Sequence, residues 1–292
     1  MKTWRADLAL VANALIWGAT FIVVKEALAE VSTLLFLALR FSLAGAALWL
    51  LFRRRLRGAG GRAWRAGVLC GVFLFSGYAF QTFGLLFTTA PKSAFITGLS
   101  TALVPLLAAA VYRIRPRRLE LAGVAVAMFG MGLMTLGSGE TQAMGGGDLL
   151  TLGCAVAFAA HIVTLGHYSG DIGFEVLAVS QVAVCAALAL GLFWWAEVPR
   201  IAWTPGVMTA VAITGLAATA LAFTVQAWAQ QYTTPTRTAL IFTLEPVFAW
   251  ATSYLLAGET LSGRGAAGAL LILGGVLLVE MKPPGARLHP SR

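Results

Sequence analysis

Long apolar stretches, separated by short polar breaks, run through nearly the whole chain. Each is about 20 residues long, close to the length that crosses a ~30 Å hydrocarbon core at ~1.5 Å rise per residue. The stretches cover residues 6–25, 33–52, 66–87, 92–112, 118–137, 148–167, 175–195, 206–230, 236–257 and 264–281. The pattern predicts an all-α membrane protein with ten transmembrane helices and no soluble domain between them.

The ten stretches fall into two matching sets of five. The matched residues are Asp7 with Asp148 and Ala14 with Ala155 at a spacing of 141; Gln81 with Gln226, Thr88 with Thr233 and Lys92 with Arg237 at 145; Pro105 with Pro246 at 141; and Gly123 and Gly130 with Gly268 and Gly275 at 145. Chance explains Ala matches easily, but the Gln, Thr, Pro and Gly matches favour a duplication. We therefore expect one repeat in residues 1–140 and a second in 141–292. Five crossings per copy would place the second copy upside down, as a 5+5 inverted-topology repeat.

Composition excludes an ordinary soluble domain. Hydrophobic residues make up 59% of the 292 residues and charged residues 11%, with a mean hydropathy of +0.83, whereas soluble domains carry about a quarter charged residues. The first stretch is not expected to be a cleaved signal, because it contains Asn13 and Lys25 and nine further stretches follow it.

The net charge of +9 is distributed unevenly between the two sides predicted for the membrane. With the N-terminus inside, 16 of the 21 Lys and Arg residues fall in cytoplasmic segments, mostly at 53–65 and 113–118. Four lie on the opposite side (Lys25, Lys92, Arg200 and Arg264), and Arg40 lies within a stretch. This asymmetry predicts cytoplasmic termini in a bacterial inner membrane, with lipid rather than nucleic acid as the partner.

The chemistry-bearing residues do not form an enzyme or metal pattern. Cys70, Cys154 and Cys185 all lie within apolar stretches, so neither a disulfide nor a zinc site is expected. The chain has three Asp residues and lacks both an H-E-x-x-H motif and a P-loop. We expect no catalytic residue, no cofactor and no metal.

Polar side chains inside apolar stretches are the candidates for function, because they are costly in a membrane. The predicted substrate-binding residues are Asn13, Trp17, Thr20, Tyr78, Gln81, Ser100, Thr101, His161, Gln226, Glu245 and Trp250. For any one of them, an interhelical hydrogen bond or a packed side chain is the alternative. Several polar faces on different helices together favour a central chamber for a small-molecule substrate.

Two charged residues and two prolines stand out in this set. Glu245 lies about nine residues into its stretch, roughly 14 Å deep, so it must be paired, solvated or protonated. A proton-coupling role and a hydrogen bond to backbone opened by Pro246 both remain open. Arg40 either snorkels, forms a structural pair, or meets Glu245 or a substrate carboxylate. Pro105 and Pro246 each remove a backbone hydrogen bond, which predicts bent helices that serve in gating or structure.

Several motifs resemble the EamA-domain members of the drug/metabolite transporter superfamily. They are the Trp17, Gly18, Phe21 and Lys25 pattern, Arg40, and the pattern of Thr243, Leu244, Glu245 and Pro246 followed by Gly258, Glu259 and Leu261. The resemblance covers both halves and implies a ten-helix inverted-repeat carrier that exports small metabolites such as amino acids. The aromatic-amino-acid exporters of the superfamily are the nearest analogue. The first half lacks the Gly-Glu-x-Leu ending, which implies that the halves have specialised.

Alternating access through a central cavity is therefore the expected mechanism, with protons as a candidate coupling ion. A passive channel or uniporter, and an exporter of multiple drugs or lipophilic cations, remain open as alternatives.

Overall fold

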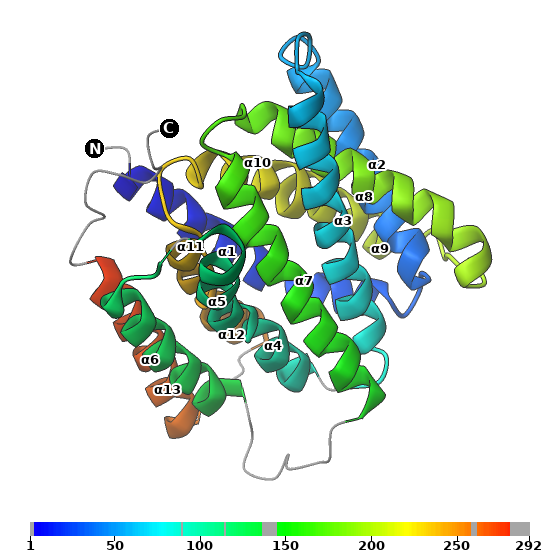
Figure 1. The fold of residues 1–292 in the computed structure, drawn as a ribbon. Coiled ribbons are helices and arrows are strands. Elements are labelled where there is room, and N and C mark those ends of the chain that lie inside the picture. The colour runs from blue at the N-terminus through cyan, green and yellow to red at the C-terminus, as the bar shows by residue number, and fades with distance from the viewer. Residues whose placement is uncertain (1–2, 89, 114, 136–144, 258–261, 281–292) are drawn as a thin grey trace.

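The computed structural model describes residues 3–88, 90–113, 115–135, 145–257 and 262–280. The predicted repeat boundary at 140 and 141, the motif residues Gly258, Glu259 and Leu261, both chain ends, and the side chains of Phe21 and Lys92 lie outside the described part. The helices are α1 (Thr3–Ala27), α2 (Thr33–Phe52), α3 (Gly61–Gly84), α4 (Ala90–Gly98), α5 (Ser100–Tyr112), α6 (Arg118–Thr135), α7 (Gly146–Tyr168), α8 (Phe174–Ala196), α9 (Pro205–Gly215), the π-helix η1 (Leu216–Leu221), α10 (Ala222–Ala229), α11 (Pro235–Phe242), α12 (Glu245–Ala257) and α13 (Gly263–Glu280) (Figure 1).

The predicted all-α class is confirmed. Apart from one antiparallel bridge between Val31 and Ile201, the described ranges contain helices and their connections. Within the described ranges, seven helices are long and apolar enough to cross a membrane, counting α4–α5 from Ser93 and α9–η1–α10 as one each, and Gly263–Val279 forms a shorter apolar helix. Helix occupies each of the ten predicted ranges, but the count of ten crossings stays a prediction.

After the third and the eighth predicted stretches, the helices of the two halves start at a constant spacing in the sequence. The starts of α4, α5 and α6 at Ala90, Ser100 and Arg118 precede those of α11, α12 and α13 by 145 residues each. Ser100 therefore corresponds to Glu245, and Pro246 to Thr101. The sequence match of Pro105 with Pro246 at 141 is wrong, because a proline at the second position of a helix and one in the interior of a helix are different structural sites.

Helices α6 and α13 pack against each other as antiparallel partners through glycines. A Cβ atom on Gly123 would lie 2.8 Å from the carbonyl oxygen of Gly275, and one on Gly130 would lie 2.6 Å from that of Gly268. Gly123 corresponds in sequence to Gly268, and Gly130 to Gly275. If each residue is replaced by its counterpart in the other half, the Gly123–Gly275 contact therefore becomes the Gly130–Gly268 contact. Small residues at such a crossing let the backbones approach closely.

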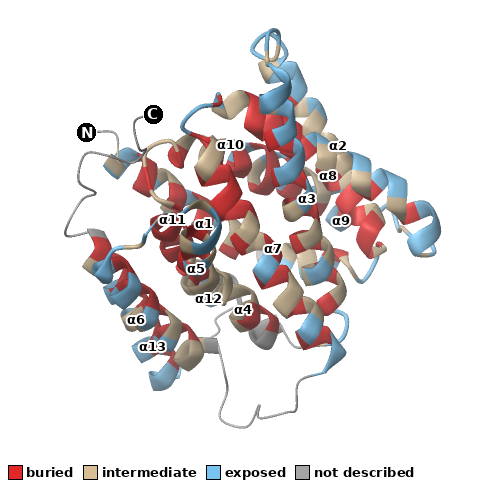
Figure 2. Cartoon of the chain, viewed as in Figure 1, coloured by how far each residue is buried: buried red, intermediate tan, exposed pale blue. Residues whose placement is uncertain are grey.

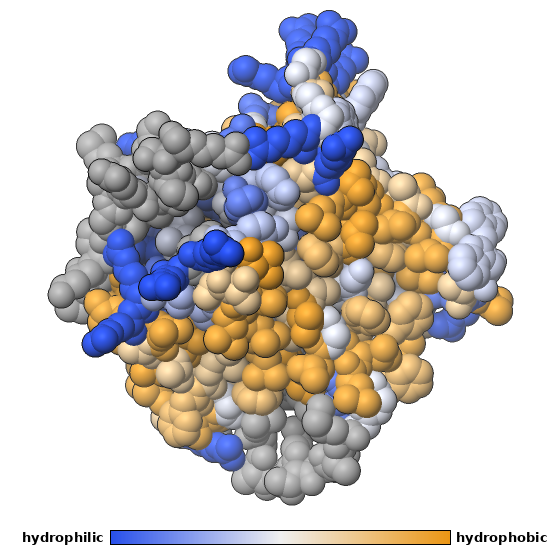
Figure 3. All heavy atoms as spheres, viewed as in Figure 1, coloured by the Kyte–Doolittle hydropathy of each residue, from blue (hydrophilic) through white to orange (hydrophobic). Residues whose placement is uncertain are grey.

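The interior of the bundle is the meeting point of the two halves. Buried residues concentrate where α1, α7, α10 and α11 come together, while exposed residues lie on outer faces (Figure 2). On the face shown in Figure 3, hydrophobic side chains cover most of the middle and hydrophilic side chains gather toward the upper edge. Trp194, Trp195 and Leu255 are each more than 70% exposed, as expected for side chains that face lipid.

Candidate functional site

A cavity of about 570 Å³ lies between α1, α2, α3, α7 and α10 and the interrupted helices α4–α5 and α11–α12. This volume falls in the range of ligand sites for small molecules. Ten of the eleven predicted binding residues line it, namely Trp17, Thr20, Tyr78, Gln81, Ser100, Thr101, His161, Gln226, Glu245 and Trp250, and Arg40 and Pro246 line it as well. Polar groups scattered over more than 200 residues of sequence thus face one space.

Two helices are interrupted beside this cavity. In the first, Leu99 separates α4 from α5, and the amide of Leu99 donates to the carbonyl of Ile96 at 3.1 Å. In the second, Thr243 and Leu244 separate α11 from α12, and their amides donate to Leu240 and Ile241, each at 3.1 Å. These hydrogen bonds join residues three apart, as in a 3₁₀ turn, and they tighten the chain at the interruption. At each interruption the start of a new helix therefore faces the cavity.

Arg40 of α2 is buried in the cavity wall and does not snorkel. Its Nε donates to the Thr219 hydroxyl at 2.7 Å, and its Nη2 donates to the Tyr78 hydroxyl at 3.1 Å and to the Ala218 carbonyl at 3.3 Å. The guanidinium also lies 4.6 Å from the centre of the Tyr78 ring. Among the described residues no carboxylate pairs with Arg40, and its Nη1 has no partner, so this charge faces the cavity uncompensated.

Glu245 is the first residue of α12 and the carboxylate of the cavity wall. No described residue forms a hydrogen bond or ion pair with its side chain, so the pairing with Arg40, one of the alternatives, is not formed. The hydrogen bond to backbone near Pro246 is likewise not formed. Its position at a helix N-terminus is favourable for a negative charge.

The close approach of α12 to α1 places Glu245 at the cavity. A Cβ atom on Gly18 would lie 2.6 Å from the Glu245 carbonyl oxygen and 2.8 Å from the Ala249 amide nitrogen. A larger residue at position 18 would therefore push the start of α12 away. This contact links the Trp17–Gly18 pattern of the first stretch to the Glu245–Pro246 pattern of the ninth.

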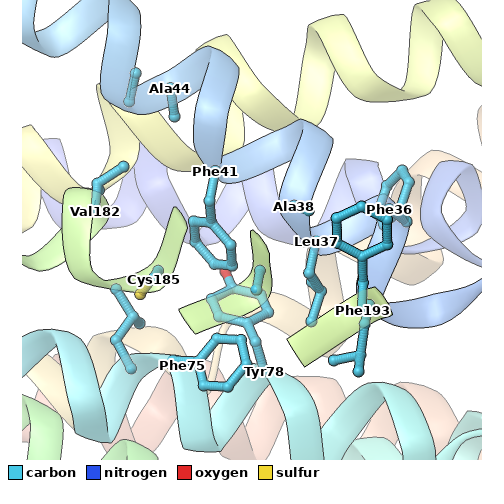
Figure 4. Close-up of a cluster of buried hydrophobic side chains, with 14 of the residues drawn as sticks. Phe36, Leu37, Ala38, Phe41, Ala44, Phe75, Tyr78, Val182, Cys185 and Phe193 are labelled. Atoms are coloured by element: carbon cyan, nitrogen blue, oxygen red, sulfur yellow. The ribbon is translucent and has the colours of Figure 1, made fainter. Parts of the chain in front are cut away.

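Aromatic side chains form much of the remaining wall. The Trp17 ring lies 4.8 Å from that of Phe242 and 5.6 Å from that of Phe223. Tyr78 lies 5.4 Å from Phe158, edge to face. On its other side Tyr78 meets Phe41 at 5.4 Å in the apolar cluster around α2 and α3 (Figure 4). Such rings offer both apolar area and edge-to-face contacts to a bound ring.

Three further polar residues complete the wall. The His161 Nε2 and the Gln181 Oε1 lie 2.7 Å apart, so His161 is held by a neighbour rather than free. The Gln226 Oε1 and the Trp250 Nε1 are buried and have no hydrogen-bond partner within the described ranges. Buried polar atoms are usually paired, so these two atoms leave one acceptor and one donor of the wall residues unused.

Two predicted site residues lie outside the cavity wall. Asn13 is buried and its Nδ2 donates to the Ala222 carbonyl at 2.7 Å, so it ties α1 to α10 instead of lining the chamber. Pro105 is buried within α5, five residues after its start, and is not among the lining residues. The interruption of this helix therefore precedes the proline, whereas Pro246 stands at the start of α12 and fits a first helical turn.

Sequence reasoning missed several residues that build the site. Gly18 was noticed only as part of a motif, and Phe242 was not proposed as a binding residue, although both line the cavity. Thr219 escaped notice because its role depends on η1, and a π-helix leaves no local sequence pattern. Only the structure shows that the helix over this stretch is one residue longer than its counterpart in the first half.

Comparisons with known proteins agree with this architecture. The model of the EamA-like transporter family matches twice, over residues 4–136 and 145–281. An uncharacterized transporter of Archaeoglobus fulgidus is 34% identical over 284 residues, which cover 97% of this chain and 88% of the relative. A crystal structure with 19% sequence identity has the same fold, with a TM-score of 0.80 over 95% of this chain and 96% of the other. The chain is therefore a multi-pass membrane protein that belongs to the EamA-like transporter family.

Proposed function

We propose that this transporter is a secondary carrier that exports small zwitterionic metabolites, with aromatic amino acids as the foremost class. The observation that carries the proposal is that Arg40 and Glu245 line one cavity without pairing with each other. An amino acid would offer a carboxylate to the guanidinium and an ammonium group to the carboxylate. The rings of Trp17, Tyr78 and Phe223 would take an aromatic side chain.

Alternating access is the mechanism that the architecture favours. The exchange-symmetric, antiparallel contact of α6 with α13 supports two copies, 1–140 and 141–292, that cross the membrane five times each with opposite polarity. Interrupted helices at the centre of inverted repeats are a common place for substrate sites. The excess of Lys and Arg in the segments assigned to the inside supports cytoplasmic termini in a bacterial inner membrane. Export rests on the resemblance to known exporters.

Protons are the proposed coupling ion. A carboxylate without a protein partner needs a counter-charge in a medium of low polarity. For Glu245 either the substrate ammonium or a proton supplies it, so the two would compete for one site. Competition of this kind couples outward movement of substrate to inward movement of a proton.

An exporter of lipophilic cations is the second candidate. A single carboxylate beside Trp17 and Phe242 suits an aromatic or quaternary cation, which both the charge and the ring faces attract. In that case Arg40 would have a structural role only.

A thermal-shift comparison of purified protein separates these candidates. The probes are L-phenylalanine, phenethylamine (which lacks the carboxylate), 3-phenylpropionate (which lacks the amine) and tetraphenylphosphonium. A ligand that binds the folded state raises the midpoint of unfolding. We expect L-phenylalanine to give the largest shift. A shift with tetraphenylphosphonium and phenethylamine but not with the amino acid would replace the first proposal with the second.

Counterflow in proteoliposomes distinguishes a carrier from a passive channel. Unlabelled L-phenylalanine inside the vesicles should accelerate uptake of labelled L-phenylalanine through a carrier. If the internal substrate has no such effect while net flux is fast, the chain is a channel and alternating access is wrong.

A further inference from the structure

The helix over the eighth predicted stretch is one residue longer than α3, its counterpart over the third stretch. α3 runs from Gly61 to Gly84 with 24 residues, while the continuous helix from Pro205 to Ala229 has 25. The two starts are 144 residues apart and the two ends 145. A single extra residue inside a helix is accommodated as a π-bulge, and this helix contains the π-helix η1 at Leu216–Leu221.

Three side chains from the first half converge on this π-helix and the turn after it. The Ala218 carbonyl accepts hydrogen bonds from the Trp17 Nε1 at 2.9 Å and from Arg40 Nη2 at 3.3 Å. The Ala222 carbonyl accepts from the Asn13 Nδ2 at 2.7 Å. A carbonyl oxygen has two lone pairs, so it can accept such a donor in addition to a hydrogen bond within its own helix.

Thr219 differs from Thr214 and Thr224, the threonines that flank it in the same helix. The hydroxyls of Thr214 and Thr224 each donate to a carbonyl of their own helix, those of Ala210 and Ala220, at 2.7 Å. The Thr219 hydroxyl instead accepts from Arg40 Nε at 2.7 Å, and the residue is fully buried. In a regular helix one residue fewer would rotate this position by about 100°, away from α2.

We propose that the one-residue insertion in this helix makes Thr219 a positioning residue, which orients Arg40 so that its Nη1 meets the carboxylate of the substrate. The inference rests on the proposed function, and it adds that the guanidinium of Arg40 selects the carboxylate of the substrate. Nε and Nη2 are held by Thr219, Ala218 and Tyr78, so the guanidinium plane is fixed and one edge stays free for the cavity. A planar guanidinium fixed in this way recognises a carboxylate directionally.

The test is the preference for L-phenylalanine over phenethylamine, measured as the ratio of their dissociation constants with reconstituted full-length protein. Thr219→Val keeps the shape and removes the acceptor, so we expect the preference to fall about tenfold, the loss of one hydrogen bond to a charged group. Thr219→Ser restores the hydroxyl and should restore the preference. Thr214→Val, which removes a hydroxyl bonded within the helix, is the matched control and should leave the preference unchanged.

Deletion of Ala217 is a second, independent variant. It removes the extra residue, returns the helix to the length of α3, and should lose the preference even though Thr219 is present. A general loss of stability would weaken both ligands alike and leave the ratio unchanged. If wild-type protein shows no preference for the amino acid, the proposed function fails. If it does and Thr219→Val retains that preference, the positioning role of Thr219 is wrong.

Discussion

The two interrupted helices have the same backbone arrangement, in which a tight turn is followed by the start of a new helix, but different side chains occupy the two starts. α5 begins with Ser100 and Thr101, whereas α12 begins with Glu245 and Pro246 at the corresponding positions. Both starts face the cavity. One half thus supplies a neutral hydroxyl where the other supplies a carboxylate, so the fold is nearly symmetric and its charge is not.

The helices that pack against these two starts, α1 against α12 and α7 against α5, also differ between the halves. Gly18 of α1 lets α12 approach until backbone meets backbone. Its counterpart at a spacing of 141 is Ala159 of α7, which packs in a cluster with Val104 and Ala108 of α5. We therefore expect the second-half interruption to be held more tightly than the first. The two halves share the geometry of the interruption, and the residues at the two helix starts place the negative charge on one side only.

The largest expected effect concerns the anchor of α11. Arg237 binds both oxygens of Asp7 at 2.7 and 3.1 Å, and both side chains are buried. Asp7→Asn removes the negative charge that Asp7 offers to Arg237, and breaking a buried ion pair by removing one partner costs about 3–5 kcal/mol. We expect a large drop in the thermal midpoint of the detergent-purified protein. Asp171→Asn, which breaks the exposed Arg62–Asp171 pair, is the control and should change little. Equal midpoints for the two variants would show that the Asp7 pair does not hold α11.

The second effect tests the charge difference between the two interruptions directly. Glu245→Gln keeps the size of the side chain and removes its charge, so transport of L-phenylalanine in proteoliposomes should fall about tenfold, as for the loss of one strong charged contact. Because an amide does not titrate, the remaining rate should no longer vary with pH. Ser100→Ala at the corresponding position should stay within about twofold of wild type. Unchanged pH dependence with full activity in Glu245→Gln would remove the coupling role.

The smallest effect tests the packing difference. Gly18→Ala forces a Cβ atom against the α12 backbone, and overpacking of this kind costs about 1–3 kcal/mol. Ala159→Gly in α7 should cost only about 1 kcal/mol, as for a glycine inside a helix. Thermal midpoints of both variants check the order. A larger loss in Ala159→Gly would mean that α5, and not α12, is the more tightly held start.

Much of the candidate site was predictable because membrane burial restricts which residues are tolerated. A carboxylate such as Glu245 or an amide such as Gln226 is costly inside an apolar stretch, so its presence indicates a structural or functional role. Ten of the eleven residues predicted on this ground line the cavity. Asn13 satisfied the same rule and yet ties two helices together, because the cost of a buried amide is the same for a structural bond and for a binding site. Sequence reasoning cannot separate these uses without knowing which carbonyl lies opposite.

The sequence by itself determined the helical class, the near-repeat of the two halves and the polar residues that need hydrogen-bond or charge partners. The length and hydropathy of a stretch, and the free-energy cost of a polar side chain inside it, can all be judged from the chain alone. Only the tertiary structure decided that Arg40 bonds to Thr219 and Ala218 rather than to Glu245, and that Pro246 begins a helix while Pro105 lies inside one. The physical reason is register, because the packing of the helices decides which hydroxyl and which carbonyl each helix turns toward its neighbour.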